Sequence, residues 1–519
     1  MGSGFLYSRD IPVVDTKQGK VRGYMDKRIS IFKGIPYAKA KRFHAPEPVE
    51  AWKGVLDATS YGFVCPLLDS TAKPNGELLV PHRYWIMNED CQNLNIWTPA
   101  CDKNKRPVIV WLHGGGYEAG SSIEQIAYEG ENMCSFGQVV VVSINHRLNI
   151  LGYFDLSAYG EEYANSGNAG TDDIIAALQW IRDNIAEFGG DPDNVTVMGQ
   201  SGGGAKVTTL LQTPAADGLY HRGINMSGVI GSLLADQEGS GENLAEALMK
   251  EVNVTGIKEL EEIPYALLAA AYLKVKPVLL SEGYYVGGKP HPNEFYVGTP
   301  DKHGFRKETA EIPLMVGTVY GEFFSFAETS YDKRGLSKKE GIDVVKHVFG
   351  EDAAEKILPL YTLAYPERNP VDILTLDYIF RRPTKEYIRQ RGALNDCTYA
   401  YLFNLDMPID GGRAPWHCAD IPFAFHNINL VPMAKGAKNA EKIEEQFFES
   451  VISFARSGNP NHNILPMWSP STEEEEHTMV FDVETRERVN YDEALISAAV
   501  EYQSVMEQRM RENAGKIQH

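Results

Sequence analysis

Residues 195–203 read VTVMGQSGG, which predicts a strand followed by a sharp turn. Its first four residues are apolar or β-branched and predict a strand, and GQSGG at 199–203 follows at once. The pattern G-x-S-x-G is typical of a strand that turns sharply into a helix and presents Ser201 with a strained backbone and an exposed Oγ. Glycines two positions before and after the serine are expected, because a Cβ at either place would clash across the turn. An ordinary strand-to-helix turn is the alternative interpretation.

A run of glycines follows the strand that is predicted earlier in the chain at residues 108–112. The run reads HGGGY at 113–117. A carbonyl that is attacked by a serine develops a negative oxygen, which needs donors already in place, and glycines let backbone N–H groups approach it closely. We therefore predict an oxyanion hole made by the N–H groups of Gly115, Gly116 and Gly202. A phosphate-binding loop is the alternative, but neither a following Lys-Ser/Thr nor G-x-G-x-x-G is present.

A serine nucleophile needs a base and an acid that orients the base. In hydrolases of this topology the chain order is serine, acid, histidine. Of the 13 histidines, His417 is favoured because it follows a predicted strand at 399–404 by a glycine-rich loop. Glu322 is the predicted acid because it follows a predicted strand at 312–317, and Asp406 is the alternative acid.

Short β-rich runs alternate with amphipathic helices along the chain, which favours an α/β class with a mostly parallel, helix-covered sheet. The central strands are expected at 108–112, 139–144, 195–198, 313–317 and 399–404, and the clearest helices at 171–188, 440–456 and 492–513. Thr171 is the expected N-cap of the first of these helices. No repeat or linker divides the chain, so a single catalytic domain over 1–519 is predicted. The stretch 230–302 is predicted to be a helical, lid-like insertion.

The composition excludes several classes of partner. The 519 residues carry a net charge of −20, which repels phosphate backbones and anionic lipid, so nucleic acid and membrane surfaces are not expected partners. No CxxC pair or zinc-spaced His/Cys cluster occurs, so neither a metal nor another cofactor is expected. The first residues lack the pattern of a signal peptide. A cytoplasmic location is expected, with a trimmed secreted form as the alternative.

These residues resemble the type-B carboxylesterases, which include the cholinesterases and the bacterial p-nitrobenzyl esterases. The resemblance covers nearly the whole chain and rests on GIPYA at 34–38, RF at 42–43, ATSYG at 58–62, EDCQNLN at 89–95, ALQWI at 177–181, FGGDP at 188–192, the serine turn, HCAD at 417–420 and GNPN at 458–461. It implies an α/β-hydrolase fold and hydrolysis of small-molecule carboxylic esters through an acyl-enzyme. It also implies that Ser201, Glu322 and His417 form the catalytic triad. Cys65 and Cys91 match the first disulfide of the family, a pair expected to be reduced in a cytoplasmic protein.

Four positions depart from the pattern of the family. Gln200 stands where Glu is usual, Gly202 where Ala is usual, Cys418 where Gly follows the histidine, and Asp173 where Gln is common. None removes a catalytic group, so the departures bear on substrate range. Gln200 in place of a carboxylate predicts a preference for neutral esters. The alternatives are a non-enzymatic, cholinesterase-like interaction protein, and an amidase or lactonase with the same triad.

Overall fold

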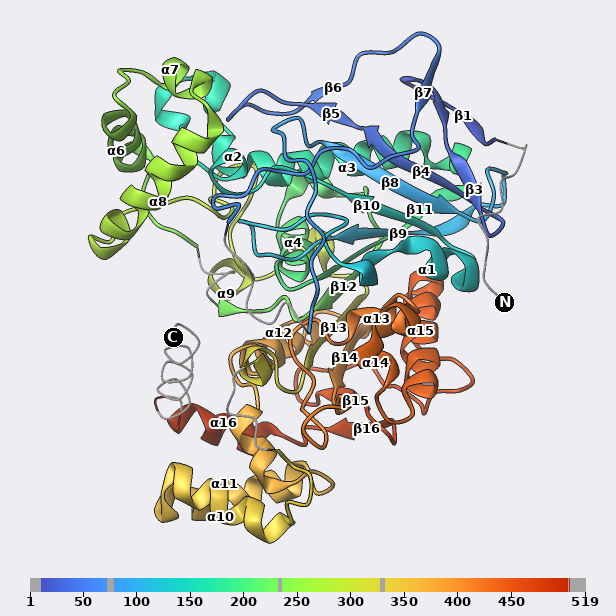
Figure 1. Cartoon of the computed structure of the whole chain (residues 1–519), viewed down its shortest axis with the longest axis vertical. Coiled ribbons are helices and arrows are strands. Elements are labelled where there is room, and N and C mark those ends of the chain that lie inside the picture. Colours follow the sequence, from blue (N-terminus) through green and yellow to red (C-terminus); the bar gives the residue numbers. More distant parts are fainter. Residues whose placement is uncertain (1–10, 72–78, 232–235, 327–331, 503, 505–519) are drawn as a thin grey trace. The chain divides into compact units, whose positions relative to one another are not determined.

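The computed structural model describes residues 11–71, 79–231, 236–326, 332–502 and 504. These residues form two compact units. The first comprises the described residues up to 312, without two short segments at 79–81 and 229–231, and the second comprises those segments and the described residues from 313 onward (Figure 1). The prediction of a single domain stays a prediction.

The sheet of the first unit combines a parallel centre with an antiparallel side. Strands β9, β10, β11 and β12 pair in parallel, and β8, β4 and β3 continue the sheet in antiparallel pairs beyond β10. In spatial order the strands are β12 (Arg222–Met226), β11 (Gly190–Gln200), β9 (Arg106–Leu112), β10 (Val140–Ile144), β8 (Asn93–Thr98), β4 (Ile29–Pro36) and β3 (Tyr24–Asp26). Every residue of β8 and β10 is buried, as expected of strands covered on both faces.

Short strands flank this sheet. They are β1 (Val13–Thr16), β2 (Gly19–Arg22) and β7 (Val55–Asp57) in one small sheet, and β5 (Ala38–Lys39) and β6 (Glu47–Pro48) in another. The longer helices of the first unit outside the segment 236–302 are α1 (Gly130–Gly137), α3 (Ala169–Asn184) and α4 (Gly202–Leu211).

Helix α3 begins earlier than the sequence predicts. Its N-cap is Asn168, so the prediction that Thr171 caps the helix is wrong. The preceding 3-10 turn at Ser166–Asn168 leads directly into the helix, and Thr171 is buried inside its first turn. Asp173 is fully buried because it forms an ion pair of 2.7 Å with the buried Arg147. A buried carboxylate is accommodated only when it is paired in this way.

The segment 236–302 is helical, as predicted, with no strand among its described residues. Its helices are α6 (Glu242–Val252), α7 (Ile257–Glu262), α8 (Tyr265–Ser281) and α9 (Pro300–His303), and Figure 1 shows α6, α7 and α8 gathered together. Leu244, Leu248 and Leu268 from these helices join Phe43 and Phe154 in one buried apolar cluster of the first unit. The role of this segment as a lid stays a prediction.

The second unit carries its own strands and helices. Strands β13 (Leu314–Val319), β14 (Thr398–Phe403) and β15 (His477–Phe481) pair in parallel, and β16 (Arg486–Val489) pairs antiparallel with β15. The principal helices are α10 (Lys338–Phe349), α11 (Glu351–Ala364), α12 (Arg381–Gly392), α15 (Ala440–Ser457) and α16 (Glu493–Glu501), with the short α13 (Ile421–Ala424) and α14 (Pro432–Lys435). The predicted C-terminal helix to residue 513 extends outside the described residues.

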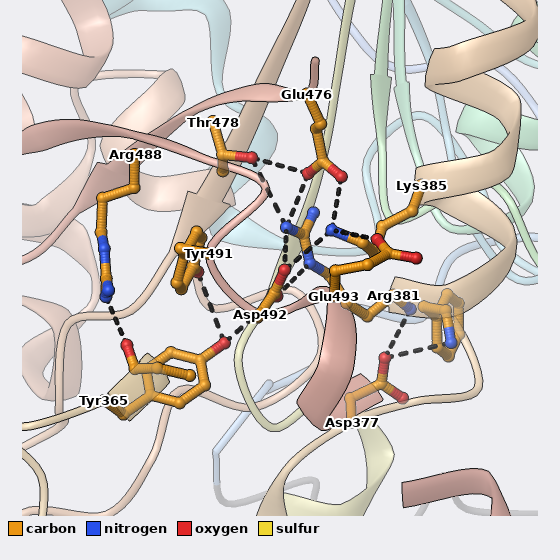
Figure 2. Close-up of polar contacts among 12 residues, drawn as sticks. Tyr365, Asp377, Arg381, Lys385, Glu476, Thr478, Arg488, Tyr491, Asp492 and Glu493 are labelled. Atoms are coloured by element: carbon orange, nitrogen blue, oxygen red, sulfur yellow. Dashed lines mark hydrogen bonds and ion pairs between the residues drawn. The ribbon is translucent and has the colours of Figure 1, made fainter. Parts of the chain in front are cut away.

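A buried network of charges links three segments of the second unit (Figure 2). Arg381 and Lys385 of α12 face Glu476, which precedes β15, and Asp492, the N-cap of α16. Arg381 contacts Asp492 at 2.8 Å and Glu476 at 2.6 Å, and Lys385 contacts the same two carboxylates at 2.8 and 2.6 Å. All four side chains are at most 4% exposed. Each charge therefore depends on its partners for the solvation that water would otherwise supply.

Candidate active site

Ser201 occupies the turn between β11 and α4. Its backbone has φ 58° and ψ −125°, a conformation that residues with a Cβ rarely adopt. The N–H of Ser201 donates to the carbonyl of Met226 at 2.8 Å, which holds the turn against the end of β12. The side chain stays partly exposed while its neighbours Gln200 and Gly202 are buried. The strained strand-to-helix turn predicted around this serine is therefore present.

The two flanking glycines are required because other backbone atoms lie too close to them for a side chain. A Cβ on Gly199 would lie 2.3 Å from the carbonyl carbon of Gly203, and a Cβ on Gly203 would lie 2.0 Å from the carbonyl oxygen of Leu112. Both distances are far below any van der Waals contact. The predicted clash across the turn is therefore the reason for glycine at position 199, whereas Gly203 is required because the end of β9 lies against it.

The glycine loop after β9 packs directly against the start of α4. Gly115 and Gly116 have φ 83° and 65°, which glycine adopts at little cost. A Cβ on Gly202 would lie 2.4 Å from the backbone N of Gly116 and 2.2 Å from its carbonyl oxygen. The loop and the residue after Ser201 are thus adjacent, as the predicted oxyanion hole requires. This contact also explains why Gly202 replaces the usual Ala, since a methyl group has no room.

In the second unit, His417 and Glu322 form a hydrogen-bonded pair. The Nδ1 of His417 faces Oε2 of Glu322, and the backbone N–H of His417 donates to the carbonyl of Glu322 at 3.1 Å. The other carboxylate oxygen, Oε1, accepts the N–H of Val319 at 2.9 Å. Glu322 is fully buried and His417 is 4% exposed. The two loops that follow β13 and β14 therefore bring together the predicted acid and the predicted base.

The alternative acid has other partners. Asp406 forms ion pairs with Lys333 at 3.0 Å and with Arg368 at 2.7 Å. Of the two carboxylates that the sequence leaves open, Glu322 is the one that the structure places on the imidazole.

Aromatic and acidic side chains surround the His417–Glu322 pair. The ring of His417 lies 4.3 Å from that of Phe323 and 5.1 Å from that of Phe380, measured between centroids. Burial, reinforced by the negative charge of Glu322, raises the pKa of Asp377 well above its ordinary value. Burial likewise raises the pKa of Asp420 to about 7. The side chain of Asp420 accepts a hydrogen bond from the hydroxyl of Tyr401. Two neighbouring acids thus resist ionisation, which limits the negative charge beside Glu322.

Sequence reasoning missed Phe380 and Asp377. Both come from the segment before α12, which carries no motif and has no fixed spacing from either loop. Lys206, a buried lysine on α4, was also missed. A lysine among the apolar residues that follow the serine is the signal that could have found it.

Cys418, which stands where the family has glycine, has a left-handed backbone with φ 77°. That conformation costs a residue with a Cβ about 1 kcal/mol or more of native-state stability. Glycine avoids this strain, but its unfolded chain has more conformational entropy, which offsets part of the gain in stability. We expect Cys418→Gly to raise the free energy of unfolding by up to about 1 kcal/mol in urea titrations. Asn439→Gly is the matched control, because Asn439 has φ 59° and asparagine tolerates this region. A loss of stability in Cys418→Gly, with the stability of Asn439→Gly unchanged, would contradict the prediction that the backbone of Cys418 is strained.

Cys65 and Cys91 are both buried and free in the structure. They belong to one small cluster with Leu148 and Leu151. The two cysteines that match the first disulfide of the family therefore lie in the same buried cluster.

Among the described residues, no group of three or more His, Cys, Asp or Glu side chains could hold a metal ion. Nor does any helix of the described chain have both the length and the apolar composition needed to cross a bilayer.

The comparisons with known proteins agree with this geometry. The model of the carboxylesterase family matches residues 10–500. The chain belongs to the carboxylesterase family. It is 31% identical over 488 residues to the para-nitrobenzyl esterase of Bacillus subtilis, covering 91% of this chain and 95% of that protein.

Solved structures of esterases are also similar to this carboxylesterase. One is an esterase from the anaerobe Clostridium hathewayi, described as able to hydrolyse aliphatic aromatic polyesters. It is 50% identical with a TM-score of 0.92, covering 96% of this chain and 99% of that one. The carboxylesterase EST55 of Geobacillus stearothermophilus is 31% identical with a TM-score of 0.70, covering 94% and 99%. The chain therefore has the α/β-hydrolase fold and is a carboxylic-ester hydrolase.

Proposed function

We propose that Ser201 is the nucleophile of this carboxylesterase, that His417 is its base and Glu322 the orienting acid, and that the N–H groups of Gly115, Gly116 and Gly202 form the oxyanion hole. The observation that carries the proposal is the strained backbone of Ser201 beside a glycine loop packed on Gly202. The hydrogen bond between His417 Nδ1 and Glu322 supports it, because that bond leaves Nε2 as the atom that takes a proton.

The reaction proceeds in two halves. The Oγ–H of Ser201 gives its proton to Nε2 of His417 while Oγ bonds to the ester carbonyl carbon, and the carbonyl π electrons move to the oxygen. The three N–H groups bind that oxyanion. The C–O bond to the alcohol then breaks, and the leaving oxygen takes the proton from His417. Water repeats the sequence on the acyl-enzyme and releases the acid and free Ser201.

A fluorophosphonate probe tests the assignment of the nucleophile. The probe forms a stable bond to an activated serine, so peptide mass spectrometry is expected to find the adduct on Ser201 alone. Labelling of another serine, or of none in an enzyme that hydrolyses p-nitrophenyl butyrate, would overturn the proposal.

The substrate class is proposed to be neutral esters. Gln200 is 1% exposed, and its Oε1 lies 3.6 Å from the position of a Cβ on Gly114, so an amide rather than a carboxylate stands beside the glycine loop. We expect butyrylcholine and its uncharged isostere 3,3-dimethylbutyl butyrate to differ less than about tenfold in kcat/KM in moderate salt. Gln200→Glu should raise the ratio in favour of the cation. A wild-type preference for the cation above tenfold would show that another residue supplies the negative charge.

Aliphatic aromatic polyesters are proposed as a further substrate, cleaved at the ester bonds of their aromatic acid units. The similarity to the Clostridium hathewayi esterase supports this proposal. So does a run of exposed apolar side chains on the segment 84–87, with Tyr84 56% and Ile86 66% exposed, because exposed apolar residues favour contact with an apolar polymer. Release of the aromatic acid from a copolyester film tests it. Activity on soluble esters without release from the film would confine the enzyme to soluble substrates.

The location of the enzyme is proposed to be cytoplasmic. In a reducing compartment the thiols of Cys65 and Cys91, which lie in one buried cluster, are expected to stay reduced. Alkylation of the native source protein under denaturing, non-reducing conditions is expected to modify both thiols, and a disulfide between them would favour the secreted alternative.

A further inference from the structure

Lys206 is a buried cation that the reaction sequence does not use. It lies on α4, on the first turns after Ser201, and is 1% exposed. Lysine is among the residues least often found fully buried, because its ammonium loses hydration there. Such a residue needs a specific partner within reach.

That partner is the loop that provides the predicted oxyanion hole. The Nζ of Lys206 donates to the carbonyl of His113 at 2.9 Å. His113 directly follows β9, which ends at Leu112, and begins the glycine loop, so the ammonium holds the loop at its first peptide group. The Nδ1 of His113 in turn lies 2.9 Å from the carbonyl of Gly114, to which it donates.

These two bonds determine which way the loop faces. In a trans peptide the N–H points opposite to the C=O. The carbonyl of Gly114, bound by the His113 ring, therefore directs the N–H of Gly115 to the other side, where the hole is predicted. The carbonyl of His113, bound by Lys206, fixes the preceding peptide and with it the ring of His113.

We propose that Lys206, as a charged ammonium, is a positioning residue that holds the glycine loop in the orientation needed to bind the oxyanion. The inference rests on the proposed function of that loop. Lys206 does not touch the substrate. Its contribution is to keep the donors in place before charge develops, and such preorganised donors have a large effect on acyl-transfer rates.

The surroundings of Lys206 favour a charge that titrates within the working range of pH. Burial lowers the pKa of Lys206 to about 7, although Glu124 and the thiol of Cys65 act in the opposite direction. Burial, with a contribution from Lys206, also holds the pKa of His113 and of His146 well below the ordinary value, so both rings are neutral. The ring of Tyr117 lies 5.8 Å from Nζ. Lys206 is thus the one group of this set that gains a positive charge near neutrality.

Steady-state kinetics on p-nitrophenyl butyrate test the role of Lys206. Lys206→Met removes the donor and the charge at similar length, and we expect kcat at pH 6 to fall at least about tenfold while KM changes less than about threefold. Leu210→Ala is the matched control, because it opens a cavity at a fully buried position of the same helix and keeps the bond from Lys206 to the carbonyl of His113. The control should lower the melting temperature and keep kcat. A Lys206→Met enzyme with kcat within twofold of wild type would overturn the proposal.

The pH dependence separates positioning by a charge from a packing role. The ratio of wild-type to Lys206→Met kcat removes the pH effects that the two enzymes share and should be largest at pH 6. It should then fall at least about threefold by pH 9, because wild-type Lys206 loses its proton. A ratio that stays constant from pH 6 to 10 would overturn the role of the charge. If Lys206→Met does not fold, Lys206→Gln provides an uncharged donor and the same comparison.

Failure of this inference differs from failure of the proposed function. If fluorophosphonate labels Ser201 in both proteins and Lys206→Met hydrolyses at the wild-type rate, only the role of Lys206 is wrong. If Ser201 is not labelled in the wild type, the proposed function itself is wrong.

Discussion

Replacing Ser201 with alanine is expected to lower kcat for p-nitrophenyl butyrate by at least about 10³-fold and to leave the unfolding midpoint close to wild type. The substitution removes one oxygen and keeps the Cβ, so the left-handed backbone at φ 58° is strained to the same degree. Stopped-flow and steady-state assays, with urea unfolding as the check on folding, measure both quantities. Near-native kcat in Ser201→Ala would refute the assignment of the nucleophile.

The base and the acid should follow the same pattern. Members of a triad act as a unit, so His417→Ala should cost about as much as Ser201→Ala. Glu322→Gln keeps the shape of the acid but loses the charge that stabilises the imidazolium, and kcat should fall strongly. Asp406→Asn is the matched control, because Asp406 pairs with Lys333 and Arg368. The opposite outcome, full activity in Glu322→Gln and loss in Asp406→Asn, would transfer the role of the acid to Asp406.

The second large effect is expected in the buried charge network of the second unit. Asp492→Asn removes one carboxylate from contact with Arg381 and Lys385 and leaves those cations only partly compensated. Breaking a buried ion pair on one side costs about 3–5 kcal/mol, so the free energy of unfolding at pH 7 should fall by about that amount. Urea unfolding monitored by tryptophan fluorescence measures it. Asp332→Asn is the control, because Asp332 pairs with Arg334 on the exposed surface, and its midpoint should not move.

The same network predicts how acid affects stability. Burial alone would raise the pKa of Asp492 and Glu476, but Arg381 and Lys385 outweigh it and hold both pKa values below the ordinary range. A carboxylate with a lowered pKa stabilises the native state above its unfolded pKa of about 4, and this stability is lost as the pH falls through the native pKa. The difference in stability between wild type and Asp492→Asn should therefore shrink as the pH falls from 5 to 3. A difference that is independent of pH would show that the carboxylate acts through packing rather than charge.

Local rules were sufficient for much of the predicted site. The turn at Ser201 and the need for Gly199 follow from the close approach of the backbone within the turn itself. Gly203 instead lies against Leu112 of a distant strand, so the reason for this glycine is not local. The strands could be located because runs such as 140–144 are buried along their whole length and are apolar except for Ser143. Their ends shifted by a few residues, since hydrogen bonding to neighbouring strands extends pairing beyond the apolar run.

Side chains from distant segments required the tertiary structure. Glu322 and His417 could be selected by chain order, but the choice over Asp406 depends on which carboxylate has an imidazole rather than two cations beside it. The predicted start of α3 was wrong because a 3-10 turn precedes the helix and moves its N-cap to Asn168. The apolar pattern of the helix does not show this turn.

The serine turn, the glycine loop and the approximate positions of the central strands along the chain could thus be predicted from the sequence, because short runs of residues carry each of these patterns. The side chains that surround those elements come from distant segments and could be identified only in the folded structure. It placed Phe380 on His417, matched Arg381 and Lys385 to Glu476 and Asp492, and brought Lys206 to the carbonyl of His113. The physical reason is that a buried charge or ring is stable only beside its partner, and the partner is provided by whichever segment the fold brings to that place.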